Sequence, residues 1–442
     1  MPSDGSPSKG IRTDIFVSAI MKPFSNTALF SSVKLGITSG FDLLFTFGGG
    51  EFHALNVSSI LSREHKIVYF PSPQYYDVYR RSDQLSERIR NIERHGITLP
   101  SSFEEVLESD YEESKIARLY MEERVDFLLN FEQKGALLQN FHLKLMKLMK
   151  VPSVILIQGL ADMDFHFRKY IADSLRLFLI SGDFKVLLYR LYHYLEALVL
   201  LREIESLKNI RLVLVVNNSY ERNVKIKHPN VRKLSPPNGI LGDPSSKISD
   251  IFPWKERTGK VQNKILFFYR LFYHKGLFDI PMILKFLREK GDVKLVIAGK
   301  FVYARDRERF FNILAAGGVS DMVEYRGFLK ESDLIEEIKT SRVVLYPSHS
   351  DSFSMVVAQS LLFGTPVVAY NIAGLSHYGE LKAVKLVNEY DYRGAAESVR
   401  EFLSMPSYDE IFDDPKLEKF FKTHTWENVA SQYIEAFKSL KG

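Results

Sequence analysis

Short apolar runs alternate with amphipathic stretches along most of the chain, and this rhythm predicts its elements. Each apolar run is bounded by turn or polar residues, and several are rich in Val, Ile or Phe, which is typical of buried strands. In the first half these runs are Thr13–Ser18, Phe41–Phe47, Lys66–Phe70, Val125–Phe131, Ser153–Ile157 and Leu212–Val216. Helical patterns lie between them, for example Glu51–Arg63 and Gly135–Lys150. Strands that alternate with helices predict a parallel sheet with helices on both faces.

The alternation stops at Ser235–Gly259, where prolines, glycines and serines gather and predict a linker. It resumes afterwards. The strands expected there are Lys264–Tyr269, Val293–Ala298, Met322–Tyr325, Val343–Tyr346 and Pro366–Ala369. The helices expected there are Pro281–Lys290, Arg307–Ala316, Ser332–Thr340, Ser354–Phe363 and, as an amphipathic tail, Trp426–Leu440.

A chain of 442 residues exceeds what one hydrophobic core usually supports, so two domains are expected. The fold class predicted is α/β, with two Rossmann-like domains. The organisation expected is a disordered polar lead over 1–12, a first domain over 13–240, a linker over 241–260, a second domain over 261–424 and a final helix over 425–442.

Composition narrows the class of protein only in part. The chain has no cysteine, which excludes disulfides and thiolate zinc sites. Its net charge of +5 is mild, so anionic partners are permitted but nucleic acid is not favoured. The lead lacks the apolar core of a signal peptide, and charges interrupt the most apolar stretch, Phe184–Leu201. We therefore expect a cytoplasmic protein, with contact to a membrane surface as an option.

The segment Ser341–Tyr370 carries the strongest chemical signal. A buried strand is followed by a loop of hydroxyls with one carboxylate, Asp351, and a helix then begins near Ser354. Ligands of open α/β sheets bind at the carboxyl ends of strands, and a helix N-terminus there offers N–H groups to a phosphate. Gln359 could face the same crevice. A plain strand–turn–helix, with Asp351 and Ser352 as caps, accounts for these residues equally well.

Two further strand ends are candidates. In Phe267–Gly276, Arg270 and Lys275 follow a strand, and two cations beside a helix N-terminus can clamp a diphosphate. An isolated pair of this kind is more often two solvated surface cations. In Phe47–Glu51, three glycines would let a ligand approach the backbone, although an ordinary turn is the simpler interpretation. Neither a dinucleotide fingerprint nor a Walker A motif is present.

Taken together, these segments resemble the family 4 glycosyltransferases of the GT-B fold. The family pattern is a Gly-Arg dipeptide after a strand, then Lys-Gly, two further strand ends with glycine, and a "PS…E…FG…E…G-x-PVVA" block. The residues that follow it here, in order, are Arg270, Lys275-Gly276, Val296–Gly299, Val323–Gly327, Pro347-Ser348, Asp351, Phe353, Gln359 and Gly364–Ala369. Tyr269 stands here in place of the glycine of the first dipeptide. Trp426-Glu427 also resemble the start of the family's closing helix, which crosses back to the first domain.

The resemblance implies two domains facing a cleft and a retaining, metal-independent hexosyltransferase. Its donor would be a nucleoside diphosphate sugar, no further cofactor is expected, and the acceptor (glycan, lipid or protein) is open. Arg270 and Lys275 would neutralise the diphosphate and Asp351 would contact the sugar, which makes these three the catalytic set. Further donor-binding residues would be Gly49, Gly50, Gly299, Arg326, Ser352, Phe353, Ser354, Met355 and Gln359.

Departures from the family pattern motivate a second hypothesis. The paired glutamates of the family appear as Asp351 and Gln359, and serines replace the glycines around Phe353. The place of the usual active-site histidine is Gln158, and His166 is equally a substitute for it or a structural residue. This second hypothesis is a GT-B binding protein or scaffold with weak or no catalysis.

Two further hypotheses concern the partner of the chain. GT-B enzymes can modify nucleic acid, which would require a basic face that the mild charge disfavours. The apolar, aromatic and basic segment Phe184–Arg202 could lie on an anionic membrane, although a core-facing helix is the favoured interpretation. The polar stretch 75–122 has no counterpart in the family pattern.

Overall fold

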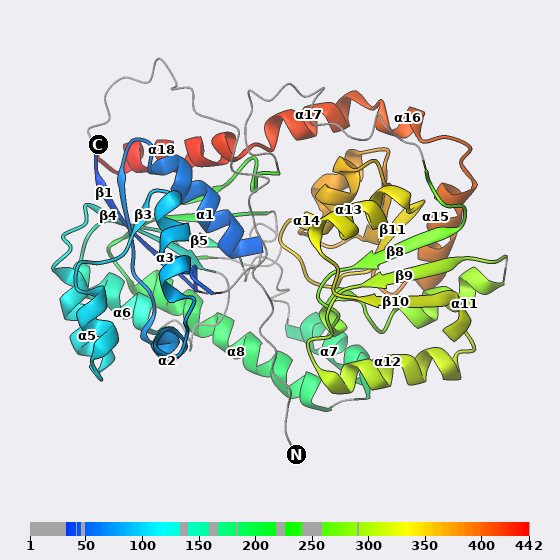
Figure 1. Ribbon diagram of the computed structural model, residues 1–442, viewed down its shortest axis with the longest axis horizontal. Coiled ribbons are helices and arrows are strands. Elements are labelled where there is room, and N and C mark those ends of the chain that lie inside the picture. Colours follow the sequence, from blue (N-terminus) through cyan, green and yellow to red (C-terminus); the bar gives the residue numbers. More distant parts are fainter. Residues whose placement is uncertain are drawn as a thin grey trace.

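The computed structural model describes residues 32–40, 42–45, 49–132, 140–158, 167–182, 184–217, 226–240, 259–289 and 291–441. Two sheets lie side by side, each with helices packed around it (Figure 1). The expected strand Thr13–Ser18, His166 and most of the linker 241–260 lie outside the described residues.

The first domain is built on a seven-stranded parallel sheet with the order β3-β2-β1-β4-β5-β6-β7. Its strands are β1 Lys34–Ser39, β2 Lys66–Tyr69, β3 Ile97–Thr98, β4 Phe127–Glu132, β5 Ser153–Ile157, β6 Ile210–Val215 and β7 Val231–Lys233. The central strands are buried on both faces, which explains their nearly continuous apolar sequences. Four of the expected strands are confirmed.

The strand predicted over Phe41–Phe47 is wrong, because the first strand of the sheet is β1. Residues 42–45 form a turn, in which the buried Asp42 accepts a hydrogen bond from the Phe45 amide (2.9 Å) and another from the Tyr69 hydroxyl (3.2 Å). Leu43 and Leu44 are buried in that turn, so the turn has the apolar sequence pattern that is typical of a buried strand. A Cβ on Gly36, at the centre of β1, would lie 2.6 Å from the Phe70 ring, so the true strand must carry a glycine that weakens its apolar pattern.

Helices cover this sheet. They are α1 Gly49–Leu61, α2 Tyr76–Arg80, α3 Leu85–Arg94, α4 Phe103–Glu108, α5 Glu113–Met121, α6 Asn140–Met149, α7 Phe167–Ser181 and α8 Phe184–Ser206. The unassigned stretch 75–122 folds as α2 to α5 with the edge strand β3. Tyr76, Tyr79 and Tyr120 anchor it, since all three are buried in the core of the first domain.

The second domain has a six-stranded parallel sheet with the order β10-β9-β8-β11-β12-β13. Its strands are β8 Lys264–Phe268, β9 Lys294–Ala298, β10 Val323–Gly327, β11 Val343–Tyr346, β12 Val367–Tyr370 and β13 Val384–Val387. Its helices are α11 Ile280–Arg288, α12 Ala304–Ala316, α13 Glu331–Thr340, α14 Met355–Leu362, α15 Tyr392–Ser404, α16 Asp409–Phe412 and α17 Pro415–Thr423. Every strand and helix expected here is confirmed, and β13, α15, α16 and α17 are additions.

The last helix, α18 Trp426–Lys441, leaves the second domain and packs against α1 of the first (Figure 1). Trp426 and Tyr433 of α18 belong to the core of the first domain. His53 of α1 fixes the contact, since its Nε2 lies 2.9 Å from the Tyr433 hydroxyl and its Nδ1 lies 3.0 Å from Oδ1 of Asn238. The expected α/β class with two Rossmann-like domains and a crossover helix is therefore confirmed. Within the described part of the chain, no helix is both long and apolar enough to span a membrane.

Candidate functional site

Two loops of the second domain converge at the carboxyl end of its sheet. β8 and β11 are parallel neighbours, so the loops that follow them leave the same edge. Lys275, in the first loop, reaches into the second: its Nζ donates to the Ser350 carbonyl (2.6 Å) and to Oδ2 of Asp351 (3.0 Å). Both side chains are nearly buried, with 9% and 12% of their surfaces exposed. The structure thus brings Lys275 and Asp351 together as a buried ion pair.

Asp351 is held by more than the ion pair. Its Oδ1 accepts from the amides of Phe353 (3.2 Å) and Ser354 (2.8 Å), and its Oδ2 accepts from the Tyr346 hydroxyl (2.5 Å). Burial acts to raise the pKa of Asp351, but the charge of Lys275 and these donors outweigh it and lower the pKa. Burial likewise acts to lower the pKa of Lys275, and Asp351 outweighs it and raises the pKa. Both groups therefore remain ionised near neutral pH.

Helix α14 begins at this pair. Its N-cap, Ser354, has φ +66°, a left-handed conformation that favours glycine, and its hydroxyl accepts from the Val357 amide (3.3 Å). Gln359 is half-buried on α14. Phe353 is buried and stacks on His377, with ring centroids 5.2 Å apart. This packing fixes the loop that precedes α14.

Two glycines allow the loops to pack this closely. A Cβ on Gly276 would lie 2.0 Å from the Pro347 carbonyl oxygen, and one on Gly299 would lie 1.8 Å from the Tyr269 carbonyl oxygen. Both glycines have positive φ (+74° and +149°). The lack of a side chain at Gly276 therefore allows the loop after β8 to approach the end of β11 closely. Gly299 allows the same close approach between the ends of β8 and β9.

Arg270 is the exposed cation of the site. Its guanidinium lies 5.6 Å from the centre of the Tyr269 ring, and partial burial, which lowers its pKa, is outweighed by Tyr269 and by Glu51 of α1, so the pKa rises. Glu51 belongs to the first turn of α1 in the first domain, next to Gly49 and Gly50. Its charge affects Arg270 across the two domains. A Cβ on Gly49 would meet no atom within 4 Å, so the space beside it is open.

The two domains touch at the start of α14. Asn217, which follows β6, donates to the Ser352 carbonyl oxygen (3.2 Å). Asn238 lies 3.6 Å from the sulfur of Met355. The segment Ser352–Met355, which is predicted to bind the donor, therefore lies where the two domains meet. A ligand site in a cleft between domains requires this position.

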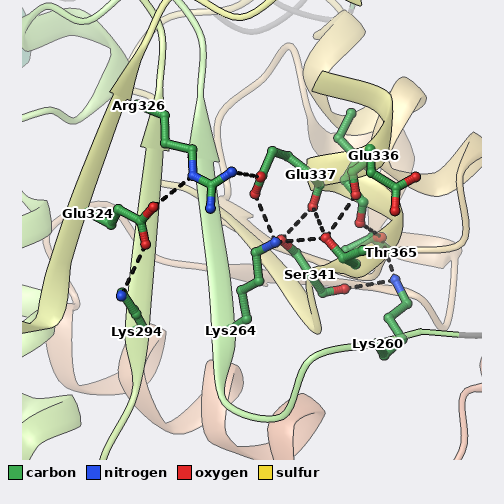
Figure 2. Close-up of polar contacts among 11 residues, drawn as sticks. Lys260, Lys264, Lys294, Glu324, Arg326, Glu336, Glu337, Ser341 and Thr365 are labelled. Carbon is green, nitrogen blue, oxygen red and sulfur yellow. Dashed lines mark hydrogen bonds and ion pairs between the residues drawn. The ribbon is translucent and has the colours of Figure 1, made fainter. Parts of the chain in front are cut away.

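Arg326 pairs with carboxylates outside this group. Arg326 lies on the edge strand β10 and donates hydrogen bonds to Glu324 (2.8 Å) and to Glu337 of α13 (Figure 2). Glu337 also forms an ion pair with Lys264 (2.8 Å). Lys264 begins β8, so this network runs from Arg326, near the carboxyl end of β10, to the amino end of β8. Two carboxylates pair with Arg326, and its predicted part in donor binding stays a prediction.

One charged residue near the site was missed. His349 lies in the loop after β11, with Nδ1 2.9 Å from Glu389 Oε1 and Nε2 2.8 Å from Asp279 Oδ2. Burial acts to lower its pKa, but the two carboxylates outweigh it and raise the pKa to about 9. Its partners come from distant segments, so the local sequence carries no signal for this cluster.

In the first domain, Gln158 is half-buried directly after β5, also at a carboxyl end. His166 lies outside the described residues. Among the described residues, no group of three or more His, Asp or Glu side chains could hold a metal ion. What the site offers is therefore two cations, a helix N-terminus and uncharged side chains between two domains, a combination suited to an anionic ligand.

Comparisons with known proteins agree with this geometry. Residues 249–416 match the family model described as Glycosyl transferases group 1. An uncharacterized glycosyltransferase of Methanocaldococcus jannaschii is 26% identical over 40% of this chain and 45% of its own length. A D-inositol 3-phosphate glycosyltransferase of Paenarthrobacter aurescens is 26% identical over 35% of this chain and 38% of its own length. The chain thus matches less than half the length of these curated relatives.

The whole fold is shared with solved structures. The Anabaena protein Alr3699/HepE, in complex with UDP and glucose, superposes with a TM-score of 0.60 at 13% identity, covering 92% of this chain and 100% of that one. The chain therefore has the GT-B fold, and residues 249–416 of it match the model of the glycosyl transferases group 1. Assignment to family 4 within that group stays a prediction.

Proposed function

We propose that this chain is a glycosyltransferase that moves a hexosyl group from a nucleoside diphosphate sugar to an acceptor. The observation that carries the proposal is the meeting of Arg270, Lys275 and the N-terminus of α14 at the carboxyl ends of β8 and β11, against the first domain. Alr3699/HepE, which shares the fold, was solved with UDP-glucose, so UDP-sugars are the first donors to test.

In this mechanism the diphosphate is the leaving group. As the bond between C1 of the sugar and the diphosphate oxygen breaks, negative charge builds on the phosphates, and fixed positive charge lowers the barrier. Arg270 is exposed and can bind phosphate oxygens bidentately. Lys275 uses two of the three N–H donors of its ammonium on Ser350 and Asp351, which leaves one for the ligand. In this proposal the ion pair fixes the Lys275 ammonium so that the remaining donor would face the ligand.

The sugar and ribose would be held by the elements around α14. The Ser354 and Met355 amides begin the helix, and Gln359 on the same helix would donate to and accept from ribose hydroxyls. Asp351 already accepts four hydrogen bonds, about as many as a carboxylate has lone pairs for, so we assign it the positioning of Lys275 and of the helix start. Its predicted contact with the sugar would require one of these bonds to be exchanged. Gly49 and Gly50 would border the donor from the first domain.

Two finer parts of the proposal rest on the family resemblance, namely retention of the anomeric configuration and independence from metal ions. A third, the cytoplasmic location, rests on the sequence pattern. Two cations at the diphosphate position support metal independence, because they supply the charge that a divalent ion would otherwise bring. Full activity in excess EDTA is the expected result, and loss of activity that Mg²⁺ or Mn²⁺ restores would contradict it. The acceptor, a glycan, lipid or protein, stays open.

The test is calorimetric titration of UDP into the wild type and three variants. Arg270→Ala and Lys275→Met should each weaken binding about tenfold or more, because each removes one charge-assisted contact. Arg288→Ala is the matched control, since it removes an exposed, paired arginine of α11. Unchanged affinity in both site variants would overturn the proposed site. Donor binding without any sugar transfer or hydrolysis would favour the scaffold hypothesis, which Gln158 and Gln359 motivate.

A further inference from the structure

Helix α8 is apolar on two opposite sides. Its inner side packs into the molecule: Ala197 and Leu200 lie in the core of the first domain and Val186 in that of the second. Its outer side carries large hydrophobic side chains that remain exposed. These are Phe184 (57% exposed), Leu188 (52%), Leu191 (38%), Tyr192 (44%), Leu195 (55%) and Val199 (42%). The core-facing helix favoured from the sequence is therefore right for one side of α8 only.

The outer residues form one stripe. They follow one another at steps of three and four residues, with Leu191 and Tyr192 adjacent, which is the spacing of a single helix face. A stripe of this kind normally faces a core. Of the sixteen large hydrophobic side chains exposed in the described part of the chain, nine belong to α7 and α8, so the exposure is concentrated and not scattered.

The exposed surface continues on both sides of α8. The neighbouring helix α7 adds Leu175 (44% exposed) and Leu179 (75%). On α8 itself Tyr189 (40%) feels the electrostatic effect of Tyr303, which with Val302 is exposed in the second domain. We call these residues together the hairpin face. It spans both domains, on the side of the molecule where α7, α8 and α12 lie (Figure 1).

The charges around the hairpin face are mostly positive. Arg176 on α7, Lys185 and Arg202 on α8, and Arg305 and Arg307 on α12 are exposed. Acidic residues are fewer at the surface of the same helices: Glu203 and Glu205 of α8 and Glu308 of α12 are exposed, whereas Glu196 and Asp306 are buried. α12 adjoins the end of α7, because a Cβ on Gly182 would lie 2.1 Å from a guanidinium nitrogen of Arg309. An apolar strip with Tyr and Phe, rimmed by cations, complements the anionic face of a lipid bilayer.

We propose that the hairpin face docks on an anionic membrane surface. The contact lies in the plane of the interface, with the leucines of α8 inserted among the acyl chains and the cations at the phosphate level. Buried Arg190 and the absence of a spanning helix among the described residues fit this orientation, because α8 stays packed on the protein by its inner side. The proposal concerns a lipid partner and does not depend on the transferase activity.

The docking would also bring the membrane close to the donor loop. Arg190 of α8 lies 3.3 Å from Nδ1 of His274, the residue before Lys275. Its guanidinium is also bonded to Ser174 of α7 (2.7 Å). The helix that carries the apolar stripe is therefore directly linked to the loop that carries Lys275.

The experiment is flotation of the full chain with vesicles of phosphatidylcholine, alone or mixed with phosphatidylglycerol. The wild type should float with the mixed vesicles and less with the neutral ones, and 1 M salt should reduce its binding. The double variant Leu188→Gln, Leu195→Gln should bind about a hundredfold more weakly, since each of the two buried leucines contributes roughly a factor of ten. Lys185→Gln should weaken binding to the mixed vesicles only.

Val261→Gln is the matched control, because Val261 is exposed (50%) outside the hairpin face. All variants change exposed residues, and unchanged melting temperatures will show that they fold. Failure of the wild type to float with either vesicle overturns the proposal, as does flotation that the leucine pair does not weaken. A wild-type dimer in light scattering that the leucine pair converts to a monomer, without flotation, would assign the face to a second copy of the chain.

Discussion

The buried pair of Lys275 and Asp351 should respond unequally to the removal of its two members. Asp351→Asn leaves the buried Lys275 ammonium without a counter-charge, with the Ser350 carbonyl and at best one neutral amide oxygen as acceptors. Its side-chain amide would also turn N–H groups toward Lys275 or toward the backbone amides of Phe353 and Ser354. Lys275→Met leaves the Asp351 carboxylate, but that group keeps the Tyr346 hydroxyl and the same two amides as donors.

The magnitudes follow from this difference in remaining partners. Stranding one charge of a buried pair costs about 3–5 kcal/mol, which we expect for Asp351→Asn. Lys275→Met should lower the stability by about 1–3 kcal/mol, because the Asp351 carboxylate keeps three hydrogen-bond donors. The double variant Lys275→Met, Asp351→Asn should be more stable than Asp351→Asn alone, because it no longer holds a stranded ammonium.

Hydrogen exchange measured by mass spectrometry on peptides of β8 and β11 reports the opening free energy of the second domain by itself, which matters in a two-domain chain. The expected order of stability is wild type, Lys275→Met, then Asp351→Asn. Equal losses, or a larger loss in Lys275→Met, would refute the reasoning. Arg288→Ala serves as the control for removal of an exposed ion pair, which should cost no more than about 1 kcal/mol.

Three further predictions concern charge, strain and packing around the site. The pKa of His349 is raised to about 9 from 6.5, so its protonation stabilises the fold fully below pH 6.5. This contribution, on the order of 3 kcal/mol, is lost as the pH rises to 9. Urea melts over this pH range should show the loss in the wild type and not in His349→Asn. Ser354→Gly relieves a positive φ at the loss of a cap, and calorimetry should find its stability unchanged or up to about 1 kcal/mol higher, whereas Ser354→Ala should lose about 1 kcal/mol. Glu337→Gln weakens two ion pairs at once and should destabilise the second domain by about 2 kcal/mol in urea melts, while equal stability would show that the network in Figure 2 contributes little.

The second domain was predictable from sequence because its strands are buried on both faces. Continuous apolar runs such as Val343–Tyr346 have no other common explanation once helices alternate with them, and every such segment formed the expected element. The first domain was less predictable. Leu43 and Leu44 made a buried turn resemble a strand, and β1 itself, with Gly36 and two hydroxyl residues, lacked a strong apolar run.

The site divides in the same way. Lys275 and Asp351 were assigned from a motif, and the structure brings them together because their strands are neighbours. The sequence did not reveal that Asp351 is shared among four donors. It also did not reveal that two carboxylates pair with Arg326, because Glu337 lies on another element. His349 was missed because its two carboxylates lie on other segments.

The central claim is tested most directly by a donor screen of the purified chain. UDP-, GDP- and ADP-sugars are supplied one at a time, and release of nucleoside diphosphate is followed in the wild type and in Arg270→Ala. The account predicts slow release from one donor by the wild type, reduced about a hundredfold or more in the variant, because Arg270 stabilises the charge of the leaving group. No release from any donor, or equal release by both proteins, would contradict it.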